Sequence, residues 1–286
     1  MKYFVISDIH SHATEMKVAL KKAGFNKRNK EHTLIVCGDV FDRGNETVEV
    51  YKYLSSIPKK RCILIKGNHE ELFFELLTKI FPDRYDFSNG TVRAFCDIAQ
   101  MPESKLNRNE LVFENIVLNK GLDYEQITDE LHRNWKVVKK LVEKSDVYKW
   151  LQSTQWRDYY EVDKYIFVHS FIPCHNPMMQ PIYGMHRIGY KEFLSYNPNW
   201  RDYTSNSLEW SDARWGCPYL QYEAGLFDEE KAKGKVLVCG HWSTSDFHEY
   251  FNNEVDNYNT YISDNLICLD ATTVISKQVN VYTFEI

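Results

Sequence analysis

LIVCGDVFDRG (residues 34–44) joins a short apolar run to a glycine, two aspartates and an arginine. The run at residues 34–37 has no polar alternation, which predicts a β-strand that is buried on both faces. Gly38 lets the backbone turn sharply directly after that strand. Taken alone, the DRG at residues 42–44 could be an ion pair beside a turn, so its meaning depends on the residues at the ends of the other strands.

Five further apolar runs of the same kind occur along the chain. Between the first three runs, residues 13–24 and 46–57 have apolar side chains at helical spacing, and Gly24 is expected to end the first helix. Strands and helices that alternate at this rhythm predict a layered α/β fold. The further runs are YFVI (3–6), CILI (62–65), YIFV (165–168), VLVC (236–239) and LICL (266–269).

The middle of the chain is expected to add helices to this frame. Residues 70–160 are mostly helical in pattern, and residues 124–152 carry one long amphipathic pattern. We predict a single domain over residues 1–286, with a mainly helical insertion at about 97–160. Residues 174–233 are rich in proline and aromatic side chains and are expected to form an irregular cover over one face of the sheet.

The composition excludes several classes of protein. With 43% apolar residues the chain folds, and a net charge of −5 gives no general field for nucleic-acid binding. None of the seven cysteines lies in a C-x-x-C pair, which argues against a zinc ribbon and suits a reducing cytosol. No apolar stretch is long enough to span a membrane and the N-terminus does not read as a signal peptide, so a cytoplasmic protein is expected.

Polar side chains lie directly after five of the predicted strands, at the point where each strand ends. Loops at the carboxyl ends of strands in an α/β sheet meet in one crevice, so we expect these side chains to lie close together. In DIH (8–10) the first and third side chains point to the same side of an extended segment and can reach one ion. The residues are Asp8, His10, Asp39, Asn68, His69, His169 and His241.

Histidine, carboxylate and amide donors together favour a site for manganese, iron or zinc. Each motif also has a simpler explanation. GNHE (67–70) could be a turn and a helix start, with Glu70 favourable in the first turn, and His169 or His241 alone could be a packed polar residue. Five such motifs in this order, each at a strand end, favour the metal site over these alternatives.

The order D-x-H, G-D-x-x-D-R-G, G-N-H-E, H and G-H resembles the calcineurin-like metallophosphoesterases. Within them it is most similar to the phosphoprotein phosphatase family, which includes Ser/Thr phosphatases, in its bacterial and phage branch. The resemblance covers residues 3–76, 165–173 and 236–243, and the tail NLICLDATTVISKQVNVYTF resembles the closing strands of that family. It implies a four-layer α/β/β/α sandwich and two divalent metal ions, with manganese expected and iron or zinc as alternatives.

The resemblance also implies a role for each metal-capable residue. Asp8 and His10 would bind the first metal, and Asp39 would bridge both metals. The second metal would be completed by Asn68, His169 and His241.

The same resemblance implies the groups that act on the substrate. His69 would be the general acid, Asp42 would orient it, and Arg43 would hold phosphate oxygens. A second phosphate-binding arginine is expected from the irregular segment before the last strands. LEWSDARW offers Arg214, and Arg187 is the alternative.

Two positions depart from the family pattern. Ser11 stands where a glycine is usual, and its side chain is expected either to crowd the site or to add a contact. Ser243 stands where many relatives outside the protein phosphatase branch have a second histidine. Without that histidine the first metal would depend on Asp8, His10 and Asp39, which favours the protein phosphatase branch.

The resulting functional hypothesis is hydrolysis of phosphate monoesters through a hydroxide that bridges the two metals, most similar to a Ser/Thr protein phosphatase. Its substrate would be a phosphorylated protein or a small phosphoester. One alternative is a hydrolase of dinucleoside polyphosphates or other nucleotides, whose bases could stack on the aromatic side chains of residues 183–227. Another is a binding module without catalysis. DRG and GNHE favour the phosphatase, and the complete set of ligand positions disfavours the binding module.

Overall fold

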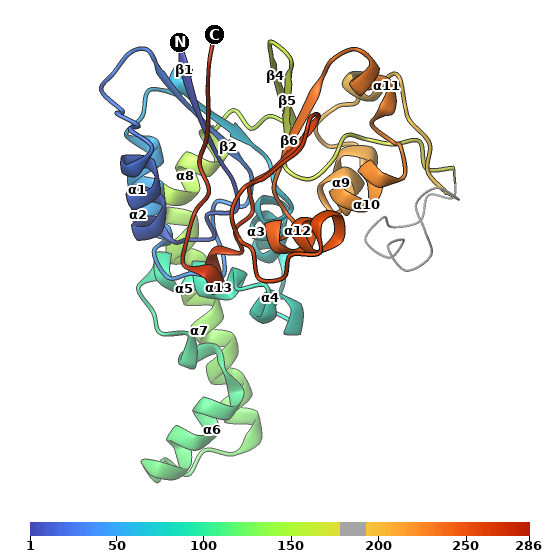
Figure 1. Ribbon diagram of the computed structural model, residues 1–286. Helices are drawn as coiled ribbons and strands as arrows, with labels where there is room; N and C mark the ends of the chain where they lie inside the picture. The colour runs from blue at the N-terminus through green and yellow to red at the C-terminus, as the bar shows by residue number, and fades with distance from the viewer. Residues whose placement is uncertain (178–192) are drawn as a thin grey trace.

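Two β-sheets lie against each other at the centre of the protein, with helices on the outer side of each (Figure 1). The computed structural model describes residues 1–177 and 193–286. The first sheet has the order β3-β2-β1-β9, in which β1, β2 and β3 are parallel and β9 is antiparallel to β1. Its strands are β1 (Lys2–Ile6), β2 (His32–Cys37), β3 (Cys62–Ile65) and β9 (Tyr282–Glu285).

The second sheet has the order β4-β5-β6-β8-β7, with three parallel strands between two antiparallel edge strands. The six apolar runs of the sequence are confirmed as β1, β2, β3, β5, β6 and β8. The strands of this sheet are β4 (Tyr159–Val162), β5 (Tyr165–Val168), β6 (Val236–Cys239), β7 (Tyr261–Ile262) and β8 (Leu266–Cys268).

Successive residues of β1 are buried against different layers, which explains the missing polar alternation. Tyr3 and Val5 pack between the two sheets, whereas Phe4 and Ile6 pack against the helices. Because side chains alternate across a strand, a strand that is covered on both faces needs an apolar residue at every position.

Helices cover the outer face of each sheet and complete the predicted α/β/β/α layering. The first sheet is covered by α1 (Ala13–Lys22), α2 (Thr47–Ser55), α3 (Asn68–Thr78), α5 (Thr91–Ala99), α7 (Tyr124–Lys144) and α8 (Asp146–Ser153). The second is covered by η5 (Trp200–Asp202), α9 (Leu208–Arg214), α10 (Pro218–Glu223), α11 (Asp228–Ala232) and α12 (Thr244–Asn252). The remaining helical elements are η1 (Lys59–Arg61), α4 (Arg84–Ser88), η2 (Glu103–Leu106), α6 (Arg108–Val117) and α13 (Thr273–Ser276).

The long amphipathic pattern at 124–152 is two helices rather than one. Ser145 has an extended backbone, and its side chain accepts a hydrogen bond from the backbone N–H of Tyr148, so it caps the start of α8. The apolar periodicity continues across the break because both helices bury one face in the same core.

The helices of the predicted insertion form a hairpin of α6 and α7 that projects away from the two sheets (Figure 1). A small separate cluster of Leu111, Ile127 and Leu131 joins the two helices. The division into one domain with an insertion and a cover stays a prediction. Within residues 1–177 and 193–286, we find no helix that is both long enough and apolar enough to cross a membrane.

Candidate metal centre

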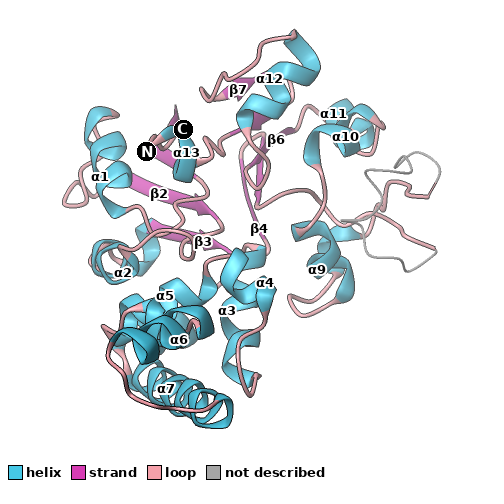
Figure 2. Cartoon of the chain, turned by 90° about the horizontal axis from the view of Figure 1, so that it is seen from below, coloured by secondary structure: helices cyan, strands magenta, loops and turns pink. Residues whose placement is uncertain are grey.

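The loops after β1, β2, β3, β5 and β6 meet at one edge of the two sheets, which Figure 2 shows from below. Two groups of buried metal-capable side chains lie there, and Asp39 belongs to both. The first group is His10, Asp39 and His69, and the second is Asp39, His169 and His241. Parallel strands bring together side chains that are far apart in sequence, as the strand-end pattern predicts.

Asp39 presents one carboxylate oxygen to each group. Its Oδ2 lies 3.6 Å from Nε2 of His10 and 3.8 Å from Nε2 of His69. Its Oδ1 lies 3.4 Å from Nε2 of His169. Burial alone would raise the pKa of Asp39, but the surrounding histidines, His169 first, hold it well below its usual range. The carboxylate is therefore ionised and available to two cations.

The backbone fixes which nitrogen two of the histidines turn toward Asp39. His169 places Nδ1 2.8 Å from the carbonyl oxygen of Cys37, and His10 places Nδ1 3.0 Å from that of Phe41. A carbonyl can only accept, so Nδ1 carries the hydrogen in each ring and Nε2 keeps a lone pair for a metal.

In the second group, His169 lies beside His241 and also beside Asn68. Nε2 of His169 lies 2.8 Å from Oδ1 of Asn68 and 3.2 Å from Nδ1 of His241. Burial holds the pKa of His241 well below its usual value, and the charge of a protonated His169 would add to this effect. Neutral rings beside an amide oxygen and a carboxylate form a donor set that suits a divalent cation.

Asp8 provides the clearest sign that a cation belongs at the site. Its Oδ2 accepts hydrogen bonds from Ser7 Oγ and from the backbone N–H of His241, but its buried Oδ1 has no hydrogen-bond partner among the described residues. Burial, followed by the charges of Asp270 and Asp39, raises the pKa of Asp8 well above its usual value. Buried carboxylates that repel one another favour a bound cation, so the donor set fits two divalent ions. Asp8, His10 and Asp39 would hold one ion, and Asp39, Asn68, His169 and His241 the other.

His69 and Arg43 lie together beside Asp39. His69 Nδ1 is 2.8 Å from Oδ2 of Asp42, which also accepts a 2.7 Å bond from Oγ1 of Thr91. Burial would lower the pKa of His69, but Asp39 and the bond to Asp42 outweigh it and raise the pKa. Nη2 of Arg43 lies 3.3 Å from Nε2 of the same ring. A proton donor and a guanidinium therefore face one point next to Asp39.

The site is built on strained backbone and on glycines. Half of the non-glycine residues with positive φ in the described chain belong to it, namely Asp8, His10, Ser11, Asp39, Asp42, Arg43 and His241. Such conformations cost about 1–3 kcal/mol each and concentrate at functional sites. Gly38 turns at φ +85°, and a Cβ on it would come within 2.5 Å of Nδ1 of His169. A Cβ on Gly67 would collide with Oδ1 of Asp39.

The two departures from the family pattern have structural explanations. Ser11 is fully buried and its Oγ lies 2.9 Å from Oγ1 of Thr47, so it joins the loop after β1 to the start of α2. This contact agrees with the second of the two effects predicted for Ser11. Ser243 caps α12, because its Oγ accepts a hydrogen bond from the backbone N–H of Ser245.

Arg214 is buried and its guanidinium is held by two carboxylates. Nη1 lies 2.5 Å from Oε1 of Glu71, and Nη2 pairs with Asp158. Its charge also contributes to the lowered pKa of His169, although burial is the main cause, so Arg214 lies near the second group. Its role in phosphate binding stays a prediction, and the alternative, Arg187, lies outside the described residues.

Sequence reasoning missed two residues of the site, Asp270 and Thr91. Asp270 comes after β8 as the other candidates come after their strands, so the strand-end rule itself could have found it. Burial raises the pKa of Asp270 to about 6, with the charge of Asp39 adding to the effect. Thr91 begins α5 and gave no signal in the sequence, because only the fold brings it to Asp42.

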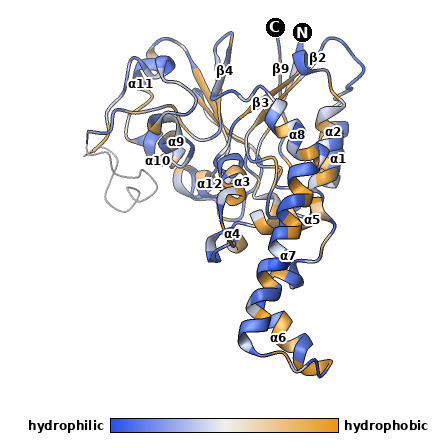
Figure 3. Cartoon of the chain, turned by 180° about the vertical axis from the view of Figure 1, so that it is seen from behind, coloured by the Kyte–Doolittle hydropathy of each residue, from blue (hydrophilic) through white to orange (hydrophobic). Residues whose placement is uncertain are grey.

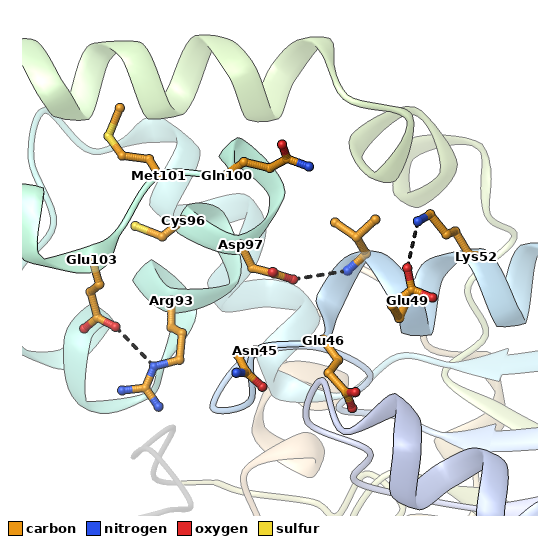
Figure 4. A pocket seen from close by; sticks show the side chains of 11 residues that line it. Asn45, Glu46, Glu49, Lys52, Arg93, Cys96, Asp97, Gln100, Met101 and Glu103 are labelled. Atoms are coloured by element: carbon orange, nitrogen blue, oxygen red, sulfur yellow. Dashed lines mark hydrogen bonds and ion pairs between the residues drawn. The ribbon is translucent and has the colours of Figure 1, made fainter.

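A separate pocket lies between α2 and α5 (Figure 4). It adjoins the site from behind, because Nη1 of Arg93 donates a 2.9 Å hydrogen bond to the carbonyl oxygen of Arg43. Its four carboxylates already have partners. Asp97 accepts from the backbone N–H of Val48, Glu103 pairs with Arg93, Glu46 accepts from Thr14, and Glu49 pairs with Lys52. Arg93 therefore supports the loop that carries Arg43. The described residues that line the pocket offer no second set of metal donors.

A family model for calcineurin-like phosphoesterases matches residues 1–257. The chain belongs to the calcineurin-like phosphoesterase family. Its site fits the two divalent metal ions with which that family works, and the metal-binding hydrolase class predicted from the motifs is confirmed.

Curated relatives match a shorter part of the chain. The symmetrical bis(5'-nucleosyl)-tetraphosphatase of Buchnera aphidicola subsp. Schizaphis graminum is 41% identical over 70 residues, 24% of this chain and 24% of that protein. The asymmetrical bis(5'-nucleosyl)-tetraphosphatase PrpE of Bacillus velezensis is 33% identical over 76 residues, 24% of this chain and 30% of that protein. The matched part is thus less than a third of the length of either relative.

Solved structures resemble the fold over nearly the whole chain. A cold-active protein tyrosine phosphatase of a psychrophilic Shewanella species is similar with a TM-score of 0.50 and 16% sequence identity. The similarity covers 99% of this chain and 75% of that protein. At this identity it supports the layered fold alone.

Proposed function

We propose that this protein is a metal-dependent phosphohydrolase that cleaves dinucleoside polyphosphates at the Asp39 site. The observation that carries the reaction class is the Asp39 carboxylate, which faces one group of buried metal donors with each oxygen. Two divalent ions held there would polarise phosphate oxygens and lower the pKa of water. Family membership supports the same reaction class.

The protein's own side chains would bind the phosphate and supply a proton. Arg43 can hold phosphate oxygens with two parallel hydrogen bonds from its planar guanidinium. His69 can donate the proton on Nε2 to the leaving oxygen, because Asp42 and Asp39 favour the charged ring. Thr91 donates a hydrogen bond to Asp42 and helps to keep that carboxylate beside His69, whose Nε2 faces Arg43 and Asp39.

The curated relatives support the nucleotide substrate. Both the symmetrical and the asymmetrical relatives named above are bis(5'-nucleosyl)-tetraphosphatases. This similarity favours dinucleoside polyphosphates over phosphorylated proteins, although DRG and GNHE by themselves favour a protein phosphatase.

A phosphomonoesterase of Ser/Thr phosphatase type is the second candidate, and one observation favours it. The charged pair of His69 and Asp42 is suited to a poor leaving group such as a serine alkoxide, which needs a proton as the bond breaks. A nucleotide leaving group is already a weak base and needs that proton less.

The two candidates are separated by direct assay with added manganese, the metal we expect to be native. Diadenosine tetraphosphate, a phosphoserine peptide and p-nitrophenyl phosphate are compared at equal enzyme concentration, and kcat/KM is measured for each. We expect diadenosine tetraphosphate to exceed the peptide by at least tenfold. Products resolved by anion exchange distinguish two molecules of ADP from AMP with ATP.

Asp39→Asn is the matched control, since it keeps the side-chain volume and removes the shared charge. It should abolish turnover of every substrate together with metal binding. If kcat/KM is higher for the phosphoserine peptide than for diadenosine tetraphosphate, the protein phosphatase replaces the dinucleoside polyphosphate hydrolase as the preferred function. Absence of turnover with all three substrates, at full metal content, would overturn the hydrolase proposal itself.

A further inference from the structure

The projecting hairpin of α6 and α7 carries an exposed apolar surface at its tip. Phe113, Ile116 and Val117 are 65%, 70% and 60% exposed, and Leu118 and Tyr124 are exposed to a similar degree. Positions 113, 116 and 117 lie on one face of α6 because they are three and four residues apart. Figure 3 shows hydrophobic residues at the free end of the hairpin, next to α6. A contiguous apolar surface of this kind marks an interaction site.

The charges of α7 are divided along its length. The half nearest the tip, residues 124–131, has three acidic residues and no lysine or arginine, whereas residues 132–144 have five basic residues and one acidic residue. Glu125, Asp129, Arg133, Lys136 and Lys140 are exposed on α7. None of them forms an ion pair within residues 1–177 and 193–286. The helix thus presents an acidic half and a basic half, and these five charges have no ion-pair partner in the described chain.

We propose that two copies of this chain pair through their hairpins, with the α7 helices antiparallel across a twofold axis. Each acidic half then lies against the basic half of the other copy. This arrangement satisfies the charges twice, because a twofold interface repeats every contact. The two halves are centred about ten residues apart, or about 15 Å along the helix, so complementary charges come into register without sliding one helix past the other.

The apolar residues fit the same arrangement. Val137 and Leu141 are 47% and 44% exposed on the basic half of α7. In an antiparallel pair they lie opposite the tip of the other hairpin, where the exposed face of α6 begins. Apolar contacts that lie beside complementary charges are typical of a specific interface. Charge complementarity within a single chain is what favours a second copy over an unrelated protein.

The test is sedimentation velocity of the whole protein at concentrations from about 1 to about 100 µM, a range that covers the dissociation constants of weak dimers. We expect a concentration-dependent dimer that weakens as salt is raised, because exposed charges are screened. Phe113→Asp with Ile116→Asp should raise the dissociation constant at least tenfold. Val18→Asp is the matched control, since Val18 is 62% exposed on α1 and should leave the dimer unchanged.

Charge reversal tests the antiparallel register specifically. Lys136→Glu with Lys140→Glu makes four of the five exposed charges acidic, and Glu125→Lys with Asp129→Lys makes all five basic. Each variant alone should be monomeric, and a one-to-one mixture should recover the dimer. Circular dichroism checks that each variant is folded. Three results would each overturn the proposal. The wild-type protein could be a monomer at about 100 µM in low salt, each variant alone could still form the dimer, or the mixture could stay monomeric.

Discussion

Asp42→Asn tests the proton-donating role that we propose for His69 separately from the metal site. The substitution keeps the side-chain volume but removes the charge that accepts the 2.8 Å bond from His69 and the 2.7 Å bond from Thr91. A hydrogen bond between charged groups contributes about 1.5–3 kcal/mol. At about 1.36 kcal/mol per tenfold in rate, its loss should slow a step that needs the charged ring by about 10- to 150-fold.

The assay is steady-state hydrolysis of p-nitrophenyl phosphate, phenyl phosphate and a phosphoserine peptide, whose leaving groups become progressively poorer. If His69 is the proton donor, the loss in kcat should grow along this series, because a poor leaving group depends more on a donated proton. Metal content measured on the same samples should stay at the wild-type level, since Asp42 lies outside both groups of metal donors.

Thr91→Val is the matched control. It removes the other hydrogen bond to Asp42 and leaves the pair with His69 intact, so the rate should fall by less than about threefold, which corresponds to less than about 0.7 kcal/mol. The reasoning fails if Asp42→Asn slows all three substrates by the same factor while both metals are retained. In that case His69 acts on the substrate or the metals in some other way than as a proton donor.

Three further outcomes are expected. Asp39→Asn should remove both metals together, and isothermal titration with manganese that still shows a full-affinity site would contradict the shared-ligand arrangement. Gly67→Ala should lower the free energy of unfolding by about 1–3 kcal/mol and weaken metal binding, because the new Cβ meets Asp39; urea unfolding of the metal-loaded protein measures it. Glu230→Gln should lower the free energy of unfolding by about 3 kcal/mol at pH 7, since buried Glu230 pairs with Arg201. Burial would raise the pKa of Glu230, but hydrogen bonds from Arg201 first, and from Tyr196, Lys233 and Trp200, hold it well below its unfolded value of about 4.3. The difference in the free energy of unfolding should therefore shrink as the pH falls below that value.

The strands and most of the site could be predicted from local sequence. The run at residues 34–37 is apolar at every position, which predicts a strand that is covered on both faces. In the structure its side chains do pack in both the helix-facing and the sheet-facing core. The polar residues directly after such runs had to lie at one edge, because parallel strands end there together. Asp39, His169 and His241 were found in this way without knowledge of any contact between them.

The tertiary structure decided what each of those residues touches. Thr91 became part of the site, and Arg214 became the partner of two carboxylates, through contacts between segments that are distant in the chain. The break at Ser145 was also hidden, because a helix cap depends on one backbone conformation while the apolar periodicity continues on either side. A strand end is encoded by its own neighbours, whereas the second partner of a buried polar group is set by whichever segment the fold packs against it.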